Sequence, residues 1–308
     1  MAIYNSNYPV KRILLLWLIV LWSSLAQAGV SAWIPFEIGN GHIRVPVTLN
    51  GEETWAILDS GATGNGISER FLASREGEYK FGRKVRVTGV LGERDVRLID
   101  GIDIGIFGSK FTIGELMPVR TYSFDFIVGL PFFENYILQI DYPNSRLRII
   151  GHDAFDLKPY ANVKMRRIGG AGAPVVKARL NDQWSPWLLL DTGATGGIFI
   201  KRGDAERFDW LETFATEKGR VRGVNKVGGT ERLNLPFMTI GPFTLESPIV
   251  TVQAEGETTN VGQELQMRLG SRLKKAESDG ILGYDILKHF IVTMDFKRSL
   301  LHLEPPPE

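Results

Sequence analysis

The chain has 308 residues and a mass of 34.4 kDa, enough for two lobes of about 100–150 residues. Its 44% hydrophobic and 23% charged residues are typical of a globular protein, and its 36 basic and 35 acidic residues leave no basic excess, so no nucleic acid partner is expected. It has no cysteine and four scattered histidines, which excludes a disulfide framework, a thiol nucleophile and Cys-ligated metals, and we expect no metal ion and no cofactor.

Residues 1–28 have the pattern of a secretory signal peptide. Two basic residues precede an apolar run at 13–22, and an A-x-A pattern ends at Ala28, which predicts cleavage after Ala28. The alternative is an uncleaved membrane anchor, because apolar character continues to about Ile34, near the ~20 residues that span a bilayer. The chain lacks both cysteine and an N-glycosylation sequon, so we expect a bacterial periplasmic or secreted protein, attached to the membrane only if the signal is retained.

Residues 29–150 are predicted to form a first lobe made mainly of β-strands. Apolar residues alternate over 45–49 and are followed by Asn-Gly at 50–51, a strong hairpin signal. Short strands recur between turns, whereas helix-length runs are few. The predicted fold class is therefore all-β with minor helices. Polar residues and Pro159 then mark residues 151–163 as a linker.

Residues 164–304 repeat the pattern of the first lobe. The run Trp-Ala-Ile-Leu-Asp-Ser-Gly-Ala at 55–62 is echoed by Trp-Leu-Leu-Leu-Asp-Thr-Gly-Ala at 187–194. Farther along each copy, Ile-Val-Gly at 127–129 matches Ile-Leu-Gly at 281–283. The sequence therefore predicts two homologous β lobes related by a pseudo-two-fold axis.

The second copy carries an additional polar segment. The first motif recurs after 132 residues and the second after 154, so the second copy is longer by 154 − 132 = 22 residues, which we assign to an insertion at 255–279. Leucines at 265, 269 and 273 have the spacing of a short amphipathic helix. A surface excursion packed on its own lobe is the favoured interpretation, and a partner-docking lid is the alternative. Residues 305–308 form a solvated tail.

Each copy supplies one aspartate after an apolar strand, Asp59 in the first and Asp191 in the second. A lone solvated carboxylate is a weak base, but two carboxyls about 3 Å apart share one proton because both cannot ionise comfortably. One then acts as base and the other as acid. A pseudo-two-fold axis brings equivalent positions face to face, so Asp59 and Asp191 are the predicted catalytic pair.

The residues after each aspartate are predicted to orient the pair rather than to react. A hydroxyl can donate to backbone across the axis, and a glycine lets backbone N–H groups approach a carboxylate. An alanine follows, and because a Ser or Thr there would lower the carboxyl pKa, its presence predicts activity at milder acidity. These residues are Ser60, Gly61 and Ala62 in the first copy and Thr192, Gly193 and Ala194 in the second.

The two motifs resemble those of the retropepsin-like and pepsin-like aspartic proteases, in which a downstream apolar-apolar-Gly strand supports each aspartate loop. Gly129 and Gly283 occupy the supporting positions here. The resemblance covers nearly all of residues 33–304 and implies two β-barrel-like lobes, a cleft between them for a peptide or protein substrate, endopeptidase activity and no cofactor. Each lobe is short, so the chain resembles a fused dimer of the retroviral type, and we expect a monomer because both half-sites lie in one chain.

The resemblance also implies a β-hairpin flap over the cleft. The matching segments lie at 87–92 and 221–229, and their glycines suit a mobile tip, although a plain hairpin is an equal interpretation for either. Neither tip has the Tyr of pepsin. The glycines are Gly89 and Gly92 in the first segment and Gly223, Gly228 and Gly229 in the second.

The sequence is compatible with two other interpretations. A chain that keeps the cleft but lacks an accessible pair of aspartates would be a non-catalytic peptide-binding module. Lobes that pair between chains would make a dimerising pseudoprotease. Retention of both aspartates and both neighbouring hydroxyls favours the protease, since a binding module needs none of them.

Overall fold

The computed structural model describes residues 29–223, 225–261 and 278–307. The predicted signal peptide at 1–28 and the leucine-rich part of the insertion lie outside these residues. Within the described ranges, no helix has the length and apolar character needed to cross a membrane.

The first half of the chain contains β-strands and two short helices. In chain order they are β1 (Ile34–Pro35), β2 (Glu37–Gly39), β3 (His42–Leu49), β4 (Glu52–Leu58), β5 (Gly66–Ser68), α2 (Glu69–Ala73), β6 (Lys80–Thr88), β7 (Glu93–Asp100), β8 (Ile102–Ile106), β9 (Ser109–Ile113), β10 (Met117–Val119), β11 (Phe126–Val128), α3 (Leu130–Asn135), β12 (Ile137–Asp141) and β13 (Arg146–Ile150).

The second half has the same succession of elements from β15 onward, with two short helices where the first half has α2. Its elements are β14 (Met165–Ile168), β15 (Ala173–Leu180), β16 (Trp187–Leu190), β17 (Ile198–Ile200), α4 (Arg202–Arg207), α5 (Trp210–Thr213), β18 (Glu217–Arg222), β19 (Val227–Asn234), β20 (Phe237–Ile240), β21 (Phe243–Glu246), β22 (Ile249–Gln253), β23 (Gly280–Leu282), α6 (Tyr284–Leu287), β24 (Ile291–Asp295) and β25 (Leu300–Glu304). The predicted class, all-β with minor helices, is confirmed.

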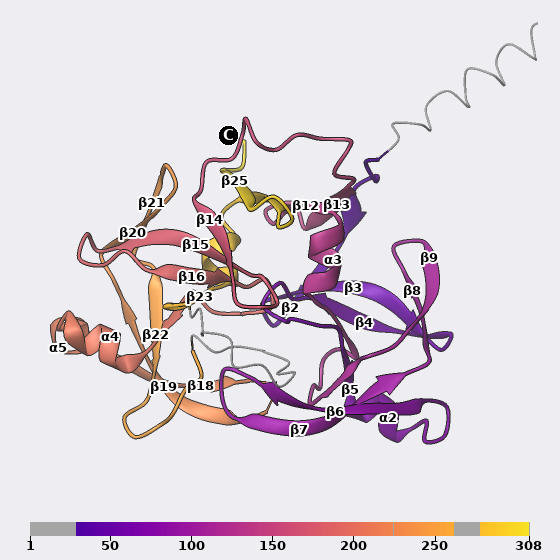
Figure 1. Cartoon of the computed structure of the whole chain (residues 1–308). Helices are drawn as coiled ribbons and strands as arrows, with labels where there is room; N and C mark the ends of the chain where they lie inside the picture. The colour runs from indigo at the N-terminus through magenta and orange to yellow at the C-terminus, as the bar shows by residue number, and fades with distance from the viewer. Residues whose placement is uncertain (1–28, 224, 262–277, 308) are drawn as a thin grey trace, which may run out of the picture.

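Strand order inside the two halves is the same. The first half has the order β10-β5-β11-β4-β3-β8-β9, and the second has β22-β17-β23-β16-β15-β20-β21. In each, the strand before the aspartate pairs in parallel with the strand of the apolar-apolar-Gly motif, β4 with β11 and β16 with β23. Figure 1 shows the two halves side by side, the first from indigo to magenta and the second from pink to yellow.

A third sheet joins the halves through β12 and β24, in the order β1-β13-β12-β24-β25. The antiparallel register aligns Gln139 with Thr293, which are equivalent positions 154 residues apart, and the Gln139 amide donates to the Thr293 hydroxyl at 2.8 Å. Pairing of equivalent residues is the signature of a two-fold axis. The approximate axis of the molecule therefore passes between these two side chains.

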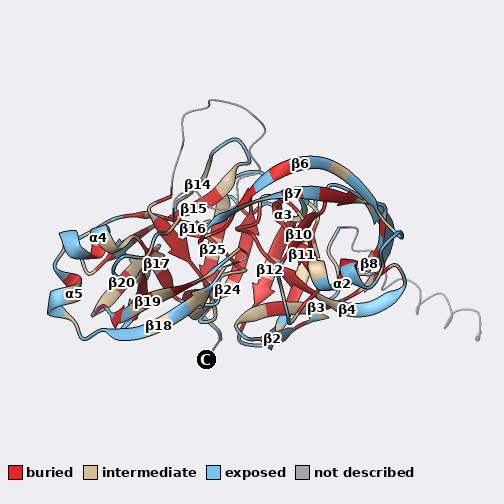
Figure 2. Ribbon diagram, turned by 90° about the horizontal axis from the view of Figure 1, so that it is seen from below, coloured by how far each residue is buried: buried red, intermediate tan, exposed pale blue. Residues whose placement is uncertain are grey.

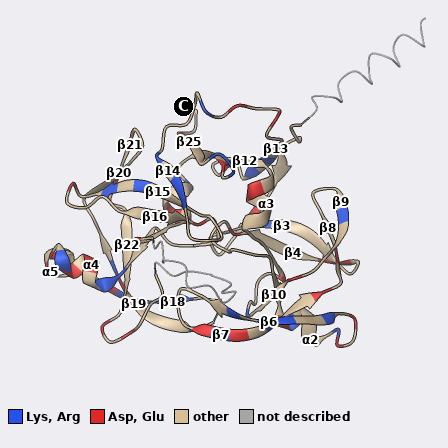
Figure 3. Ribbon diagram, viewed as in Figure 1, with Lys and Arg blue, Asp and Glu red and all other residues tan. Residues whose placement is uncertain are grey.

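The core follows from the alternation of apolar and polar residues along the strands. In β3, buried residues alternate with more exposed ones, as a strand with one face on the core requires. Figure 2 shows buried segments in the middle of each half and exposed segments on the outer hairpins. Basic and acidic segments are intermixed over both halves in Figure 3.

Candidate active site

The two aspartates occupy equivalent loops that meet between the halves. Asp59 follows β4 and its backbone N–H donates to the carbonyl of Val128 at 3.0 Å, while that of Asp191 donates to Leu282 at 3.0 Å. Each loop therefore starts from a parallel strand pair that is buried in the core of its half. Both side chains are nearly inaccessible, with 7% of Asp59 and 8% of Asp191 exposed.

The predicted hydroxyl residues hold the two loops together by reciprocal hydrogen bonds. The Ser60 hydroxyl donates to the carbonyl of Leu190 at 2.7 Å, and the Thr192 hydroxyl donates to that of Leu58 at 2.8 Å. Each hydroxyl also accepts the backbone N–H of the other residue at 3.0 Å. All of these groups are buried and satisfied, so the relative position of the loops is closely determined.

The predicted glycines bring backbone N–H groups and the opposite carboxyl into close contact. Oδ1 of Asp59 accepts from Gly61 at 3.0 Å and Ala62 at 2.9 Å, and Oδ1 of Asp191 accepts the corresponding N–H groups of Gly193 and Ala194 at 2.8 and 3.1 Å. A Cβ at Gly61 would lie 2.6 Å from Cγ of Asp191, and one at Gly193 would overlap the Asp59 carboxyl. Only glycine fits at these positions.

Burial and mutual repulsion raise the proton affinity of the pair. The pKa of Asp59 is raised well above its usual value, first by burial and then by the negative charge and hydrogen bond of Asp191. Burial also raises the pKa of Asp191, although the backbone N–H of Gly193 and the hydrogen bond with Asp59 oppose the shift. The two carboxyls, which we call the dyad, therefore interact strongly and titrate as one unit.

The supporting glycines lie directly under the dyad loops. Gly129 packs on the carbonyls of Gly64 and Ala62, and the N–H after it, on Leu130, donates to Ala62 at 2.8 Å. In the second half, a Cβ at Gly283 would lie 2.6 Å from the Ala194 carbonyl. The apolar-apolar-Gly motif thus supports the loop because a larger residue would displace it.

Comparisons with known proteins agree with this fold. A sequence model described as aspartyl protease matches residues 176–286, which include Asp191 and Gly283. The crystal structure of an aspartic proteinase from Irpex lacteus is similar over 89% of this chain and 97% of that one, with a TM-score of 0.55 and 14% sequence identity. The chain has the aspartic protease fold. No curated protein sequence matches it significantly.

The flap glycines divide into two groups in this aspartic protease fold. Gly89 and Gly92 close the β6–β7 hairpin, where the Gly89 N–H donates to the Gly92 carbonyl at 3.1 Å and Gly92 has a φ of +75°. Gly223 stands at the end of β18, and its N–H donates to Lys226 at 2.9 Å. These three residues lie at hairpin tips. Figure 1 shows both hairpins along the lower edge of the molecule.

Gly228 and Gly229 lie elsewhere than the sequence indicated. They are inside β19, paired with Val221 and Arg220, rather than at the tip of the second hairpin. Their small size serves packing, because a Cβ at Gly228 would lie 3.0 Å from Leu91 of the first hairpin, and one at Gly229 would lie 3.2 Å from Ala254. The two glycines leave room for the close approach of Leu91 and Ala254 instead of forming a turn.

Two side chains near the dyad, the half-buried His42 and the buried Tyr142, were missed by sequence reasoning. The imidazole of His42, at the start of β3, packs edge-to-face on Phe124 at 5.6 Å and hydrogen-bonds to the backbone of Gly193. Burial lowers the pKa of His42 to about 4, and that hydrogen bond opposes the shift. The hydroxyl of Tyr142 is buried without a partner among the described residues, and burial and the charge of Asp191 raise its pKa. Neither residue belongs to a motif.

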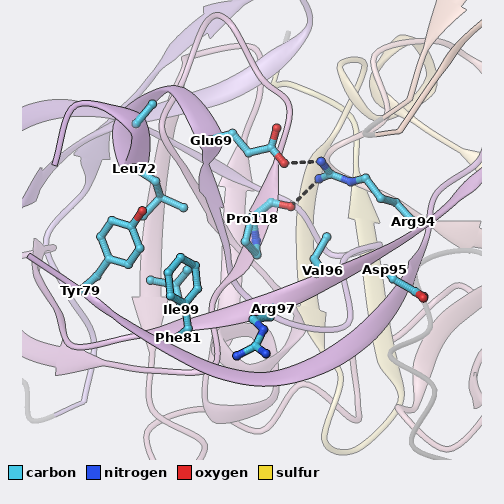
Figure 4. Close-up of a pocket in the computed structure, with 11 residues that line it drawn as sticks. Glu69, Leu72, Tyr79, Phe81, Arg94, Asp95, Val96, Arg97, Ile99 and Pro118 are labelled. Atoms are coloured by element: carbon cyan, nitrogen blue, oxygen red, sulfur yellow. Dashed lines mark hydrogen bonds and ion pairs between the residues drawn. The ribbon is translucent and has the colours of Figure 1, made fainter. Parts of the chain in front are cut away.

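A cavity of about 380 Å³ lies in the first half, between α2 and the β6–β7 hairpin. Figure 4 shows its apolar wall, formed by residues such as Leu72 and Phe81, with Arg94 pointing to Glu69 and to the Pro118 carbonyl. Neither aspartate lines it, so it is separate from the candidate active site. Among the described residues no group of His, Asp and Glu side chains has the arrangement of a metal site.

Proposed function

We propose that the protein is an aspartic endopeptidase that hydrolyses peptide bonds with water activated between Asp59 and Asp191. The single observation that carries this proposal is the pair of buried carboxyls joined across the halves by the reciprocal Ser60 and Thr192 hydrogen bonds. A binding surface does not need two buried acids that share a proton. Such a pair, however, is what general acid–base hydrolysis at acidic to neutral pH requires.

The reaction proceeds without a covalent enzyme intermediate. The ionised carboxyl accepts a proton from the water, whose oxygen attacks the scissile carbonyl carbon while the protonated carboxyl donates to the carbonyl oxygen. The C–N bond then breaks as the amine nitrogen takes up a proton, and the diol returns one proton to the pair. The products are a carboxylic acid and an amine, and the dyad again holds one proton.

The proposal extends to the oligomeric state and the cellular location of the protein. Both aspartates lie in one chain, so a monomer is sufficient for activity, and gel filtration of active fractions tests this. Residues 1–28 support export to the periplasm or beyond. Detection of the mature N-terminus at Gly29 in a periplasmic fraction supports cleavage, whereas retention of the segment in a membrane fraction supports an anchor.

The second candidate is a non-catalytic peptide-binding module. It is favoured by one observation, which is that the apolar surface beside Asp191 is covered by the chain's own Val90 and Val261. The two candidates differ in whether peptide bonds break.

The deciding experiment incubates the purified protein with a broad peptide library across pH 3 to 7. We expect cleavage by the parent, its inhibition by pepstatin, and its loss in both Asp59→Asn and Asp191→Asn. Asp285→Asn is the control, because this aspartate lies outside the dyad, in α6 directly after the Ile-Leu-Gly motif. A folded parent that binds peptides without cleaving any of them refutes the endopeptidase and supports the binding module.

A further inference from the structure

The tip of the β6–β7 hairpin, which we call the flap tip, is held by the second half of the chain. The side-chain amide of Asn225 donates to the carbonyls of Val87 and Gly92 at 3.1 and 3.0 Å. The side-chain amide of Asn260 donates to Gly89 and Gly92 at 2.9 and 3.2 Å. The backbone carbonyls of the flap tip are thus paired with side-chain donors from the second half.

Asn260 belongs to residues 254–261, which we call the strap. The strap continues from β22 and is the described beginning of the predicted insertion. Its backbone pairs with the flap tip, since the Asn260 N–H and the Thr259 hydroxyl donate to the Val90 carbonyl at 2.8 and 3.1 Å. Glu257 ties it to the second hairpin through Lys226 at 3.4 Å. The described part of the insertion therefore contacts the first half and is not confined to its own lobe.

The strap ends in the apolar surface beside Asp191. Val261 is 1% exposed and packs with Leu189 and Ile281. Leu189 lies two residues before Asp191, and Ile281 is its partner in the parallel strand pair. Ala194 of the dyad loop and Val90 of the flap tip pack against the same cluster. Val261 and Val90 therefore cover the apolar residues that lie next to the Asp191 loop.

The first half differs at the equivalent surface. There the face that carries Ile57 and Ile127 is covered by apolar side chains of its own hairpin, such as Val87 and Leu98. In the second half, β18 and β19 extend the sheet by pairing β19 with β22. A hairpin that continues the plane of a sheet leaves that sheet's face open. The strap and Val90 cover this face.

We propose that the strap is an intramolecular latch, which keeps the flap closed and occupies the apolar subsite beside Asp191 until a peptide displaces it. The inference rests on the proposed function, because a subsite exists only if peptides enter the cleft. A substrate side chain and Val261 compete for one apolar surface, so the apparent affinity for peptide is reduced by the fraction of molecules in which the latch is open. Weakening the latch raises that fraction.

A thiol probe reports latch opening without any catalysis. The chain has no cysteine, so Val261→Cys introduces a single thiol of similar size. We expect slow maleimide modification of this variant compared with Ser109→Cys, which is exposed on β9. Asn260→Ala removes the side-chain hydrogen bonds to Gly89 and Gly92 and is expected to accelerate modification of Val261→Cys about fivefold or more.

The matched control is Asn234→Ala. The side-chain amide of Asn234 also donates to a backbone carbonyl, that of Ser247 at 3.1 Å, but within its own half and away from the flap. We expect it to leave the modification rate of Val261→Cys unchanged. Equal modification rates with and without Asn260→Ala, or a Val261→Cys thiol that reacts as fast as Ser109→Cys, would overturn the latch.

Peptide cleavage then links the latch to substrate entry. In the chain without added cysteines, Asn260→Ala is expected to raise kcat/KM by about the same factor as the modification rate, and Asn234→Ala to leave it unchanged. If modification accelerates but kcat/KM of an active enzyme does not rise, the strap does not limit substrate entry and the proposal is wrong. If modification accelerates while neither parent nor variant cleaves any peptide, the latch stands and the proposed endopeptidase fails.

Discussion

Replacement of His42 by Gln is expected to make folding less sensitive to acid. The imidazole is largely buried against Phe124 and hydrogen-bonds to the backbone of Gly193 beside the dyad. Burial disfavours the imidazolium, and the pKa of His42 is lowered from 6.5 to about 4 despite that hydrogen bond. A Gln side chain keeps a donor for the same backbone group and does not titrate in this range.

The direction and size of the effect follow from proton binding. Between pH 6.5 and about 4, the unfolded chain holds a proton on this imidazole and the folded chain does not, so the free energy of unfolding falls as the pH falls. The pKa difference of 6.5 − 4 = 2.5, at about 1.36 kcal/mol per unit, corresponds to about 3 kcal/mol. This stabilisation is fully present above pH 6.5 and is lost on approaching pH 4.

Urea unfolding of the full chain at pH 7 and pH 4 measures this difference. We expect the drop in unfolding free energy between the two pH values to be smaller by about 3 kcal/mol in His42→Gln than in the parent. His289→Gln changes an exposed histidine and is expected to follow the parent. An equal drop in the parent and in His42→Gln would refute the assignment of acid sensitivity to this buried imidazole.

Four further variants test the dyad and the flap. Burial raises the pKa of Asp191, so the stability that its protonated form contributes is lost as pH rises. Asp191→Asn is therefore expected to raise Tm more at pH 7 than at pH 3. An equal change in Tm at the two pH values, measured by calorimetry, contradicts this. Gly193→Ala places a methyl group against the opposite carboxyl and should abolish peptide cleavage while the chain stays folded by circular dichroism, so an active variant would be inconsistent with the site geometry. Ala194→Thr places a hydroxyl beside the Asp191 carboxyl, and the acidic limb of the kcat/KM profile should move to lower pH; an unmoved limb means that the alanine does not set the acidity of the dyad. The Cβ of Leu91 lies 3.8 Å from the position of a Cβ at Gly223, a distance that suits a disulfide. The double variant Leu91→Cys with Gly223→Cys should therefore be inactive when oxidised and active when reduced. Equal activity in both states would show that the hairpins need not separate.

Local patterns in the sequence were sufficient for the fold class and for the candidate dyad. The period-two alternation at 45–49 predicts a strand because successive side chains of a strand face opposite sides. The run of apolar residues before Asp59 and Asp191, followed by a hydroxyl residue and a glycine, specifies a buried strand and a tight loop. Because the pattern occurs twice, symmetry alone suggested that the two loops meet.

Glycine was a weaker guide when its neighbours come from a distant part of the chain. Gly92 lies in a turn with positive φ, as its sequence context indicates. Gly228 has a similar context but lies in a strand, and Leu91 packs where its side chain would be. A sequence shows that a residue is small, but the reason can be backbone conformation or the close approach of another segment.

The contacts around the dyad depended on the packing of the two halves against each other. His42 approaches Gly193, and Val261 approaches Leu189, through side chains that carry no periodicity and belong to no motif. The repeat predicts two homologous halves, yet the second hairpin continues its sheet while the first folds over its own sheet. The strap covers the face that is left open in the second half. Strand patterns and turns are local properties and can be read along the chain. Burial is produced by residues that are far apart in sequence. The assembled halves therefore decide which sheet face remains open for the strap and which histidine is desolvated.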